Sequence, residues 1–433
     1  MSDFPRTLFV ETTTRCNLTC PMCVKNAPGW RGGEGHMAWT TFEHLEPALP
    51  HAGAVVLNGT GEPLLQPELP RMIARAKALQ PKDGWCGLQT NGLLLNAARA
   101  RELVRAGLDV LCLSVDGEAA SFGHGAGQGG AVDRAVSLVR NAARECGRSL
   151  RLGAEFVLMR SNAAELPGLV DWAAALGLDF LLVTHMLPVA PAQEAEALFH
   201  PCSRAAIAFF AHYQPQADTL GFSFSELARI AMKYNRSADE EKLLDLAREM
   251  RQNAQARGIW LDVERLARTD FAQLDELAEL FAQAGKRAAA AGLDLRLPGL
   301  AAPDADRRCA FVDGGAACID WLGNVSPCQF LWHGYACSLY GEAKRVHPIQ
   351  FGNICATPLA EIWRAPEFRV FRDQARAGEF PPCGDCATGL CSDIRGDAPF
   401  ERDCLGLGVP CGHCPWAVGQ LMCLGTELNV STR

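Results

Sequence analysis

Nineteen cysteines are spread very unevenly along this chain of 433 residues. Cys16, Cys20 and Cys23 fall within eight positions, whereas twelve cysteines lie between Cys309 and Arg433. The first residues lack a basic stretch followed by a long apolar segment, so we expect a cytoplasmic protein. Cysteines in a reducing compartment more often hold metal or carry out redox chemistry than form disulfides. The distribution therefore predicts two metal-bearing regions.

Composition narrows the class of protein. Hydrophobic residues make up 48% and charged residues 21% of the chain, as in ordinary globular proteins. The net charge is -8, and no long run of Lys and Arg is present to neutralise phosphates, so nucleic acid is not an expected partner. No apolar run approaches 18 residues, so we expect no membrane partner either.

The N-terminal part alternates short apolar runs with segments of helical periodicity. Gly107 and Gly177 stand where helices are expected to stop. Strands separated by helices favour parallel pairing with right-handed crossovers. Both a doubly wound sheet and a complete or partial barrel fit this pattern. The expected strands are Leu8–Thr12, Ala54–Asn58, Cys86–Thr90, Val110–Val115, Leu152–Leu158 and Phe180–Thr184.

Two further regions follow these six units. The stretch from Pro191 to Pro298 is rich in Ala, Leu, Glu and Arg at helical spacing. We expect it to be a helical insert that covers the molecule, with a platform for substrate or partner as the alternative. Beyond it Gly, Pro and Cys dominate, which is typical of a small domain held by metal. The predicted division is 1–190, 191–300 and 301–433.

The motif Cys16-x3-Cys20-x2-Cys23 follows the first expected strand. In β/α barrels, the carboxyl ends of the strands carry the chemistry. Three thiolates at this spacing can hold three irons of a cubane cluster and leave the fourth iron open to a small molecule. A zinc knuckle completed by a residue such as His36 is the structural alternative.

This motif, placed after a first strand, resembles the radical S-adenosylmethionine (SAM) superfamily. Three later strand ends carry similar marks: Asn58–Pro63, which has Thr60 where relatives have glycine, Thr90–Gly92 and Leu113–Gly117. The resemblance implies a partial (β/α)6 TIM-type barrel, with a 4Fe-4S cluster held by the three cysteines. It also implies SAM contacts from Gly61, Glu62, Pro63, Asn91, Ser114 and Asp116.

The implied chemistry is reductive cleavage of SAM to a 5'-deoxyadenosyl radical, which abstracts hydrogen from the substrate. A glycine-rich turn allows the backbone to approach a ligand closely, and Glu62 can accept hydrogen bonds from the ammonium group of SAM. No catalytic side chain beyond the cluster is assigned. Met22 stands where many relatives have an aromatic residue. Arg160 is a candidate for the arginine that relatives use near the SAM carboxylate, with an ordinary surface arginine as the alternative.

The C-terminal cysteines resemble the SPASM extension of radical SAM enzymes, which carries one or two auxiliary 4Fe-4S clusters. By order along the chain, Cys309, Cys318 and Cys328 are expected in one cluster, with a later fourth ligand such as Cys404. Two cubanes need eight of the twelve thiolates, so a third cluster or a zinc site stays open. The candidate ligands are Cys309, Cys318, Cys328, Cys383, Cys386, Cys391, Cys404, Cys411, Cys414 and Cys423. The remaining cysteines are expected in packing: Cys86, Cys112, Cys146, Cys202, Cys337 and Cys355.

The ending is similar to SPASM proteins regarded as metalloenzyme maturases. Sulfatase-maturing relatives carry an aspartate where this chain has Gln329, and an amide cannot serve as that base. Oxidation of a sulfatase residue is therefore disfavoured. The resemblance to SPASM enzymes implies a peptide or protein substrate, in the maturation of a metalloenzyme, and an electron donor such as ferredoxin or flavodoxin. The alternatives are an enzyme that forms thioether or carbon–carbon links in ribosomal peptides and, in another class, a zinc-binding scaffold. His333, His347 and His413 are candidate acid/base or ligand residues near the clusters.

Overall fold

A computed structural model describes residues 3–115, 130–304, 307–388, 391 and 395–426. Six parallel strands pair in chain order, and the first and last residue of each strand lie within two residues of the expected bounds. This confirms the predicted partial barrel of β/α units. The strands are β1 (Thr7–Val10), β2 (Ala54–Val56), β3 (Trp85–Thr90), β4 (Val110–Val115), β5 (Arg151–Leu158) and β6 (Phe180–His185).

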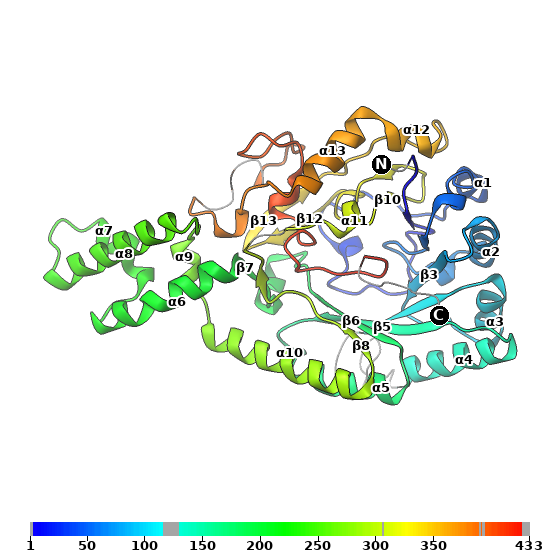
Figure 1. The fold of residues 1–433 in the computed structure, drawn as a ribbon, viewed down its shortest axis with the longest axis horizontal. Coiled ribbons are helices and arrows are strands. Elements are labelled where there is room, and N and C mark those ends of the chain that lie inside the picture. Colours follow the sequence, from blue (N-terminus) through cyan, green and yellow to red (C-terminus); the bar gives the residue numbers. More distant parts are fainter. Residues whose placement is uncertain (1–2, 116–129, 305–306, 389–390, 392–394, 427–433) are drawn as a thin grey trace.

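Helices between these strands cover one face of the sheet (Figure 1). The third helix shows why they begin and end where they do. The Asn96 side chain accepts a hydrogen bond from the Arg99 N–H at 2.9 Å, and Gly107, with φ of 105°, ends the helix. The covering helices are α1 (Trp39–Glu43), α2 (Leu69–Leu79), α3 (Ala97–Ala106), α4 (Ala131–Glu145) and α5 (Leu166–Ala175).

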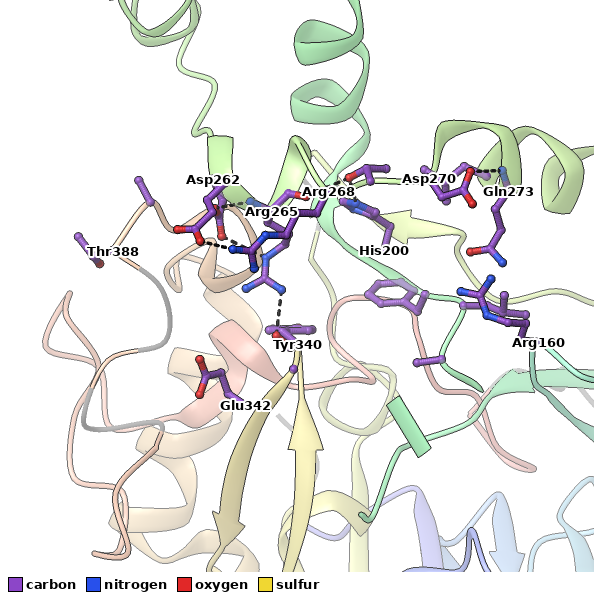
Figure 2. A pocket seen from close by; sticks show the side chains of 18 of the residues that line it. Arg160, His200, Asp262, Arg265, Arg268, Asp270, Gln273, Tyr340, Glu342 and Thr388 are labelled. Carbon is purple, nitrogen blue, oxygen red and sulfur yellow. Dashed lines mark hydrogen bonds and ion pairs between the residues drawn. The ribbon is translucent and has the colours of Figure 1, made fainter. Parts of the chain in front are cut away.

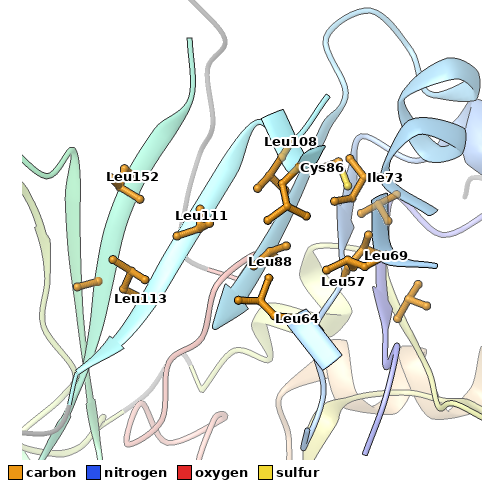
Figure 3. Packing of buried hydrophobic residues seen from close by; sticks show 14 of the residues in the cluster. Leu57, Leu64, Leu69, Ile73, Cys86, Leu88, Leu108, Leu111, Leu113 and Leu152 are labelled. Carbon is orange, nitrogen blue, oxygen red and sulfur yellow. The ribbon is translucent and has the colours of Figure 1, made fainter. Parts of the chain in front are cut away.

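Apolar side chains alternate between the two faces of the sheet. Leu57, Leu88, Leu111 and Leu113 point toward the helices and pack into the larger core (Figure 3). The alternate strand residues form a second core with side chains from the C-terminal domain. The second core includes Phe9, Val56, Val110, Cys112, Phe180, Phe311, Phe330 and Leu424.

Strands from later in the chain extend the sheet at both edges. The C-terminal strand β10 (Ala316–Ile319) pairs parallel to β1 and is followed by the antiparallel β11 (Val325–Ser326). At the other edge, β8 (Asp294–Arg296) pairs parallel to β6. The first strand of the chain is therefore a central strand of the finished sheet.

The insert divides into two parts. Its first helices pack around a core of their own and project from the body of the molecule (Figure 1). The long α10 (Phe271–Ala291) instead packs against α5 and covers the sheet. The projecting lobe contains α6 (Arg204–Thr219), α7 (Leu227–Ala231), α8 (Ala238–Ala256) and α9 (Val263–Leu266).

The C-terminal domain has little regular structure and lies against the inner face of the sheet. Its last described residues contact β6, where Thr184 Oγ1 accepts a hydrogen bond from the Met422 N–H at 3.0 Å. Gly425 approaches Phe9 and Val56. In the described residues, no helix has the length and apolar character needed to cross a membrane. The remaining elements are β7 (His200–Ser203), β9 (Ala301–Ala302), α11 (Ala310–Asp313), β12 (Tyr335–Leu339), β13 (Glu342–Val346), α12 (Leu359–Arg364) and α13 (Pro366–Ala377).

Candidate active site

Cys16, Cys20 and Cys23 lie on one partly exposed loop beyond the carboxyl end of β1. The loop turns back on itself, because the Cys23 N–H donates to the Cys20 carbonyl oxygen at 3.1 Å. Burial raises the pKa of the Cys23 thiol, the backbone N–H of Lys25 lowers it, and the charge of Cys16 raises it again. The charge of Cys16 thus affects the ionisation of Cys23.

The base of this loop is fixed by a neighbouring segment and by one buried amide. The Gly35 carbonyl oxygen accepts hydrogen bonds from Thr13 Oγ1 at 2.9 Å and from the Thr14 N–H at 3.0 Å. Gln66 Nε2 donates to the Thr12 carbonyl oxygen at 2.7 Å and to the Met37 carbonyl oxygen at 3.1 Å. These bonds hold the cysteine loop at the carboxyl edge of the sheet.

The turn Asn58–Pro63 packs directly against the loop. The Glu62 N–H donates to the Arg15 carbonyl oxygen at 2.8 Å. A Cβ atom on Gly61 would lie 2.5 Å from the carbonyl oxygens of both Thr13 and Arg15, so only glycine fits. Pro63 is buried and begins a short 3-10 helix, Pro63–Leu65. Two of the predicted site motifs are therefore adjacent in space.

Glu62 joins this turn to the end of β3. Its carboxylate is 2% exposed and accepts hydrogen bonds from Thr90 Oγ1 at 2.6 Å, the Asn91 N–H at 2.8 Å and the Leu64 N–H at 3.0 Å. Asn91 Nδ2 donates in turn to Asn17 Oδ1, within the cysteine loop, at 2.9 Å. Asn17 was not among the predicted site residues, and its contact depends on a partner 74 positions away.

Ser114 lies near the end of β4 and accepts a hydrogen bond from Gln89 Nε2 at 3.2 Å. Asp116 falls outside the described residues. Gly61, Glu62 and Asn91 thus contact the cysteine loop or the residues just before it, and Ser114 lies on β4, the strand next to β3.

Four C-terminal cysteines line one small apolar cavity, and we name them the inner thiol group: Cys309, Cys328, Cys411 and Cys414. Burial raises the pKa of Cys309, whereas the backbone N–H groups of Val312 and Phe311 lower it. The pKa of Cys328 is also raised by burial and lowered by two backbone N–H groups. N–H groups directed at sulfur stabilise the thiolate form that binds metal.

The walls of this cavity are aromatic and apolar and carry one buried hydrogen-bond donor. Trp416 packs against Phe311 and Phe330, with ring centroids 5.9 and 6.0 Å apart. Its indole N–H is buried and has no acceptor among the described residues. A buried donor without a partner is costly, and the sulfide of a cluster held by these cysteines would supply an acceptor.

A second set, the outer thiol group, consists of Cys383, Cys386, Cys391 and Cys404. Burial, followed by the charges of Cys404 and Cys391, raises the pKa of the Cys383 thiol to about 12. Burial also raises the pKa of Cys404, to which the charges of Cys391 and Cys386 contribute. We group these four thiols because their charges act on one another, and Cys391 and Cys404 are exposed.

This grouping differs from the expectation based on chain order. Cys411 and Cys414 line the cavity with Cys309 and Cys328, whereas Cys404 does not line it. Cys318 is wholly buried in β10, where its side chain does not line the cavity. Burial raises its pKa, with contributions from Cys328 and from Cys423.

The other cysteines are mostly packed. Cys86, Cys112, Cys202 and Cys337 are buried, Cys146 is partly exposed and Cys355 is exposed. Of the candidate histidines, His347 lies at the surface and His413 is buried between Cys411 and Cys414. His333 is buried against Glu11, a residue that the sequence analysis missed. The available signal was an acidic residue inside the expected apolar strand Leu8–Thr12.

The thiol groups are looser than a site for one metal ion. Across the part of the chain that the structure describes, no three His, Cys, Asp or Glu side chains converge to hold a single ion. A structural zinc brings its sulfurs to about 2.3 Å from one point, whereas a cubane takes each thiolate on a different iron.

A separate polar cavity of about 610 Å³ lies between the insert, β7 and the β12–β13 hairpin (Figure 2). Arg160 lines this cavity, and its Nε donates to the Ala195 carbonyl oxygen at 2.8 Å. Arg265 bridges Asp262 and the Tyr340 carbonyl oxygen. Ala387 and Thr388 bring the edge of the outer thiol group to the same cavity.

Comparisons with known proteins agree with this geometry. Residues 10–166 match the family model of the radical SAM superfamily, and residues 309–387 match SPASM, an iron-sulfur cluster-binding domain. The cofactor-modifying protein of the tungsten-containing aldehyde ferredoxin oxidoreductase of Pyrococcus furiosus is 25% identical over 98% of both chains. The PqqA peptide cyclase of Granulibacter bethesdensis is 33% identical over 40% of this chain and 45% of its own length.

Among solved structures, Streptococcus suis SuiB bound to S-adenosylmethionine is 14% identical and has a TM-score of 0.50. The match covers 93% of this chain and 77% of that one. This likeness supports the fold alone. The two family models contain the cysteine loop on one side of the insert and, on the other, Cys309, Cys328, Cys383 and Cys386. The chain is therefore a radical SAM enzyme that carries a SPASM iron–sulfur domain and belongs to the radical SAM superfamily.

Proposed function

We propose that this enzyme cleaves SAM at the cysteine loop and modifies a peptide or protein during the maturation of a metalloenzyme. The observation that carries the proposal is the packing of Asn58–Pro63 against the loop of Cys16, Cys20 and Cys23 at the carboxyl edge of the sheet. When bound there, a 4Fe-4S cluster supplies the electron that splits the sulfonium compound.

The residues of the chain bind and orient SAM around that cluster. Gly61 and Pro63 bring the backbone of the turn close to the ligand. Glu62 holds the turn to Asn91 and provides negative charge toward the ammonium group, and Ser114 and Asp116 bind the ribose hydroxyls. The apolar inner face of the sheet keeps water away from the reacting atoms.

We assign one auxiliary cluster to the inner thiol group and a second to the outer thiol group. This uses eight of the ten candidate ligands and leaves Cys318 and Cys423 as buried thiols between them and the barrel. The proposed boundaries at residues 190 and 300 separate the barrel from the insert and the insert from this domain. A cytoplasmic ferredoxin or flavodoxin is the proposed electron donor, and the enzyme class is oxidoreductase.

One observation favours maturation over peptide cyclisation as the role. The Pyrococcus protein aligns over 98% of both chains, whereas the peptide cyclase aligns over 45% of its length. A matched pair of assays separates the roles, one with a small peptide encoded beside the enzyme and one with a neighbouring metalloenzyme. Modification of the peptide alone would favour the cyclase role.

The radical step is tested with purified, anaerobically reconstituted protein. With dithionite and SAM, the wild type is expected to form 5'-deoxyadenosine. Variants with Cys16, Cys20 or Cys23 changed to Ala are expected to lose it while they keep the iron of the auxiliary clusters. Cys355→Ala is the control, because this cysteine is exposed and lies outside all three groups. Product formation by the three Ala variants would contradict the proposal.

A further inference from the structure

Glu11 is a buried carboxylate that joins the barrel to the SPASM domain. It follows β1 directly, and its side chain is 0% exposed. Oε1 accepts hydrogen bonds from the Thr60 N–H at 3.1 Å and from the Thr60 hydroxyl at 2.9 Å. Oε2 accepts from His333 Nε2 at 2.9 Å and from the Trp321 N–H at 3.4 Å. One oxygen thus faces each domain.

The barrel side of this contact accounts for a departure of the sequence from its family. Thr60 stands where relatives have glycine, and its hydroxyl is one of the two donors to Glu11. Gly59, one residue earlier, leaves the necessary room, since a Cβ atom there would lie 2.4 Å from Glu11 Cγ. Thr60 is therefore matched to Glu11 rather than a neutral replacement.

The SPASM side is equally well held. The His333 ring packs against Trp30, with centroids 4.9 Å apart, and Trp321 Nε1 donates to the Gly32 carbonyl oxygen at 2.9 Å. Trp30 and Gly32 belong to the segment just after the cysteine loop. Movement of the SPASM domain would therefore disturb both the cysteine loop and the turn that contains Thr60.

The hydrogen bonds of Glu11 stabilise the arrangement in which the SPASM domain packs against the barrel. A buried carboxylate is costly unless its lone pairs are occupied by donors. Removal of one donor leaves part of that charge unpaired, which costs more than an ordinary hydrogen bond contributes. Undocking would take away both SPASM donors at once and leave Glu11 with Thr60 alone.

We propose that Glu11 is a positioning residue that makes the SAM-binding geometry of the turn Asn58–Pro63 depend on docking of the SPASM domain. The inference rests on the proposed role of that turn in binding SAM. Glu11 and His333 are 0% and 4% exposed, so neither touches substrate, and both act through Thr60. The coupling gives the auxiliary domain control over whether SAM is held for cleavage.

The test measures SAM affinity by equilibrium dialysis of the reconstituted holoenzyme, together with iron content. Thr60→Val removes the hydroxyl and keeps the branched shape, and His333→Phe removes the donor from the other domain. Each is expected to weaken SAM binding by roughly tenfold, within the usual range of coupling between sites. Thr60→Ser and His333→Gln keep a donor and are expected to restore most of the affinity.

A double variant tests whether the two positions act through Glu11. If they do, Thr60→Val combined with His333→Phe loses less affinity than the product of the two single losses. Thr219→Val makes the same chemical change on the exposed face of α6 and is expected to leave SAM affinity unchanged.

The outcomes separate this inference from the proposed function. Wild-type protein that carries its clusters but neither binds SAM nor forms 5'-deoxyadenosine would remove the proposed function itself. Wild-type protein that binds SAM, with Thr60→Val and His333→Phe within twofold of its affinity, would overturn the coupling alone. If His333→Phe fails to fold, the comparison of Thr60→Val with Thr60→Ser still decides the matter.

Discussion

At the scale of single residues, close backbone contacts decide which side chains the candidate site can contain. Gly61 lies between the turn and the cysteine loop, where two carbonyl oxygens occupy the space of a Cβ atom. Glu62, one residue later, binds three donors from two strand ends. Gly61 must therefore lack a side chain, whereas Glu62, its neighbour, must have a carboxylate that accepts hydrogen bonds.

Gly61→Ala is expected to destabilise the protein by about 1–3 kcal/mol, because an added methyl group in a packed site forces the backbone apart. It should also weaken SAM binding, since the turn moves away from the loop. Gly285→Ala is the control, because nothing lies within 4 Å of that Cβ position on α10 and alanine favours helix. Chemical denaturation measures the stability of the two variants, Gly61→Ala and Gly285→Ala. Equal stability of these variants would contradict the prediction.

A buried histidine provides a prediction for pH. Burial lowers the pKa of His185 from 6.5 to about 4, although its Nε2 contacts the Gly299 carbonyl oxygen. Between these values the unfolded chain binds a proton that the folded chain does not. Stability should therefore fall as the pH is lowered from 6.5 toward 4, by up to roughly 1.4 kcal/mol per pH unit for this group.

His185→Gln should remove that share of the pH dependence. The quantity to compare is the change in unfolding free energy between pH 7.5 and pH 5.5, in the variant and in the wild type. His200→Gln should act in the same direction, because burial also lowers the pKa of His200 to about 4. An identical loss in wild type and both variants would show that these histidines are not the cause.

At the scale of elements, the strands and their order followed from the sequence, because apolar runs and helix stops are local signals. The edges of the sheet did not, since β10 is too short to distinguish from a loop and its partner lies about 300 residues away. The cysteine groups were limited in the same way. Spacing indicated metal ligands, but only the path of the chain brings Cys411 to Cys309 and Cys404 to Cys383.

The two thiol groups predict which substitutions act together. Cys309→Ala and Cys411→Ala should each remove the inner cluster, about four irons per chain, and their combination should remove no more. Cys383→Ala and Cys404→Ala should do the same for the outer cluster. Iron and sulfide analysis with electron paramagnetic resonance distinguishes the two. Additive iron loss from Cys309 and Cys411 would contradict the grouping.

At the scale of the whole molecule, the SPASM domain completes the barrel instead of standing apart from it. It supplies β10 beside β1 and covers the inner face around Phe9, Val56 and Phe180. The projecting helices of the insert, by contrast, have a core of their own. The barrel and the cluster domain should therefore unfold as one unit, with the lobe as a separable part.

Truncation after Pro303 tests this dependence. The fragment would lose β10 and leave the edge of β1 and an apolar sheet face exposed to water, so it should be insoluble or aggregate. Soluble yield and size-exclusion chromatography measure the result against the full chain. A monomeric fragment that unfolds cooperatively would show that the barrel is independent.

The position of β1 between β2 and β10 also has a consequence for biosynthesis. Thr7 pairs with Ala316, so β1 waits for translation of about 300 more residues before β10 can pair with it. At about 5–20 residues per second, this delay lasts roughly 15–60 s. During that time the edge of β1 that faces away from β2 has no partner, and the three thiols of the cysteine loop lie beside it. This topology therefore delays completion of the sheet until the first part of the SPASM domain has been made.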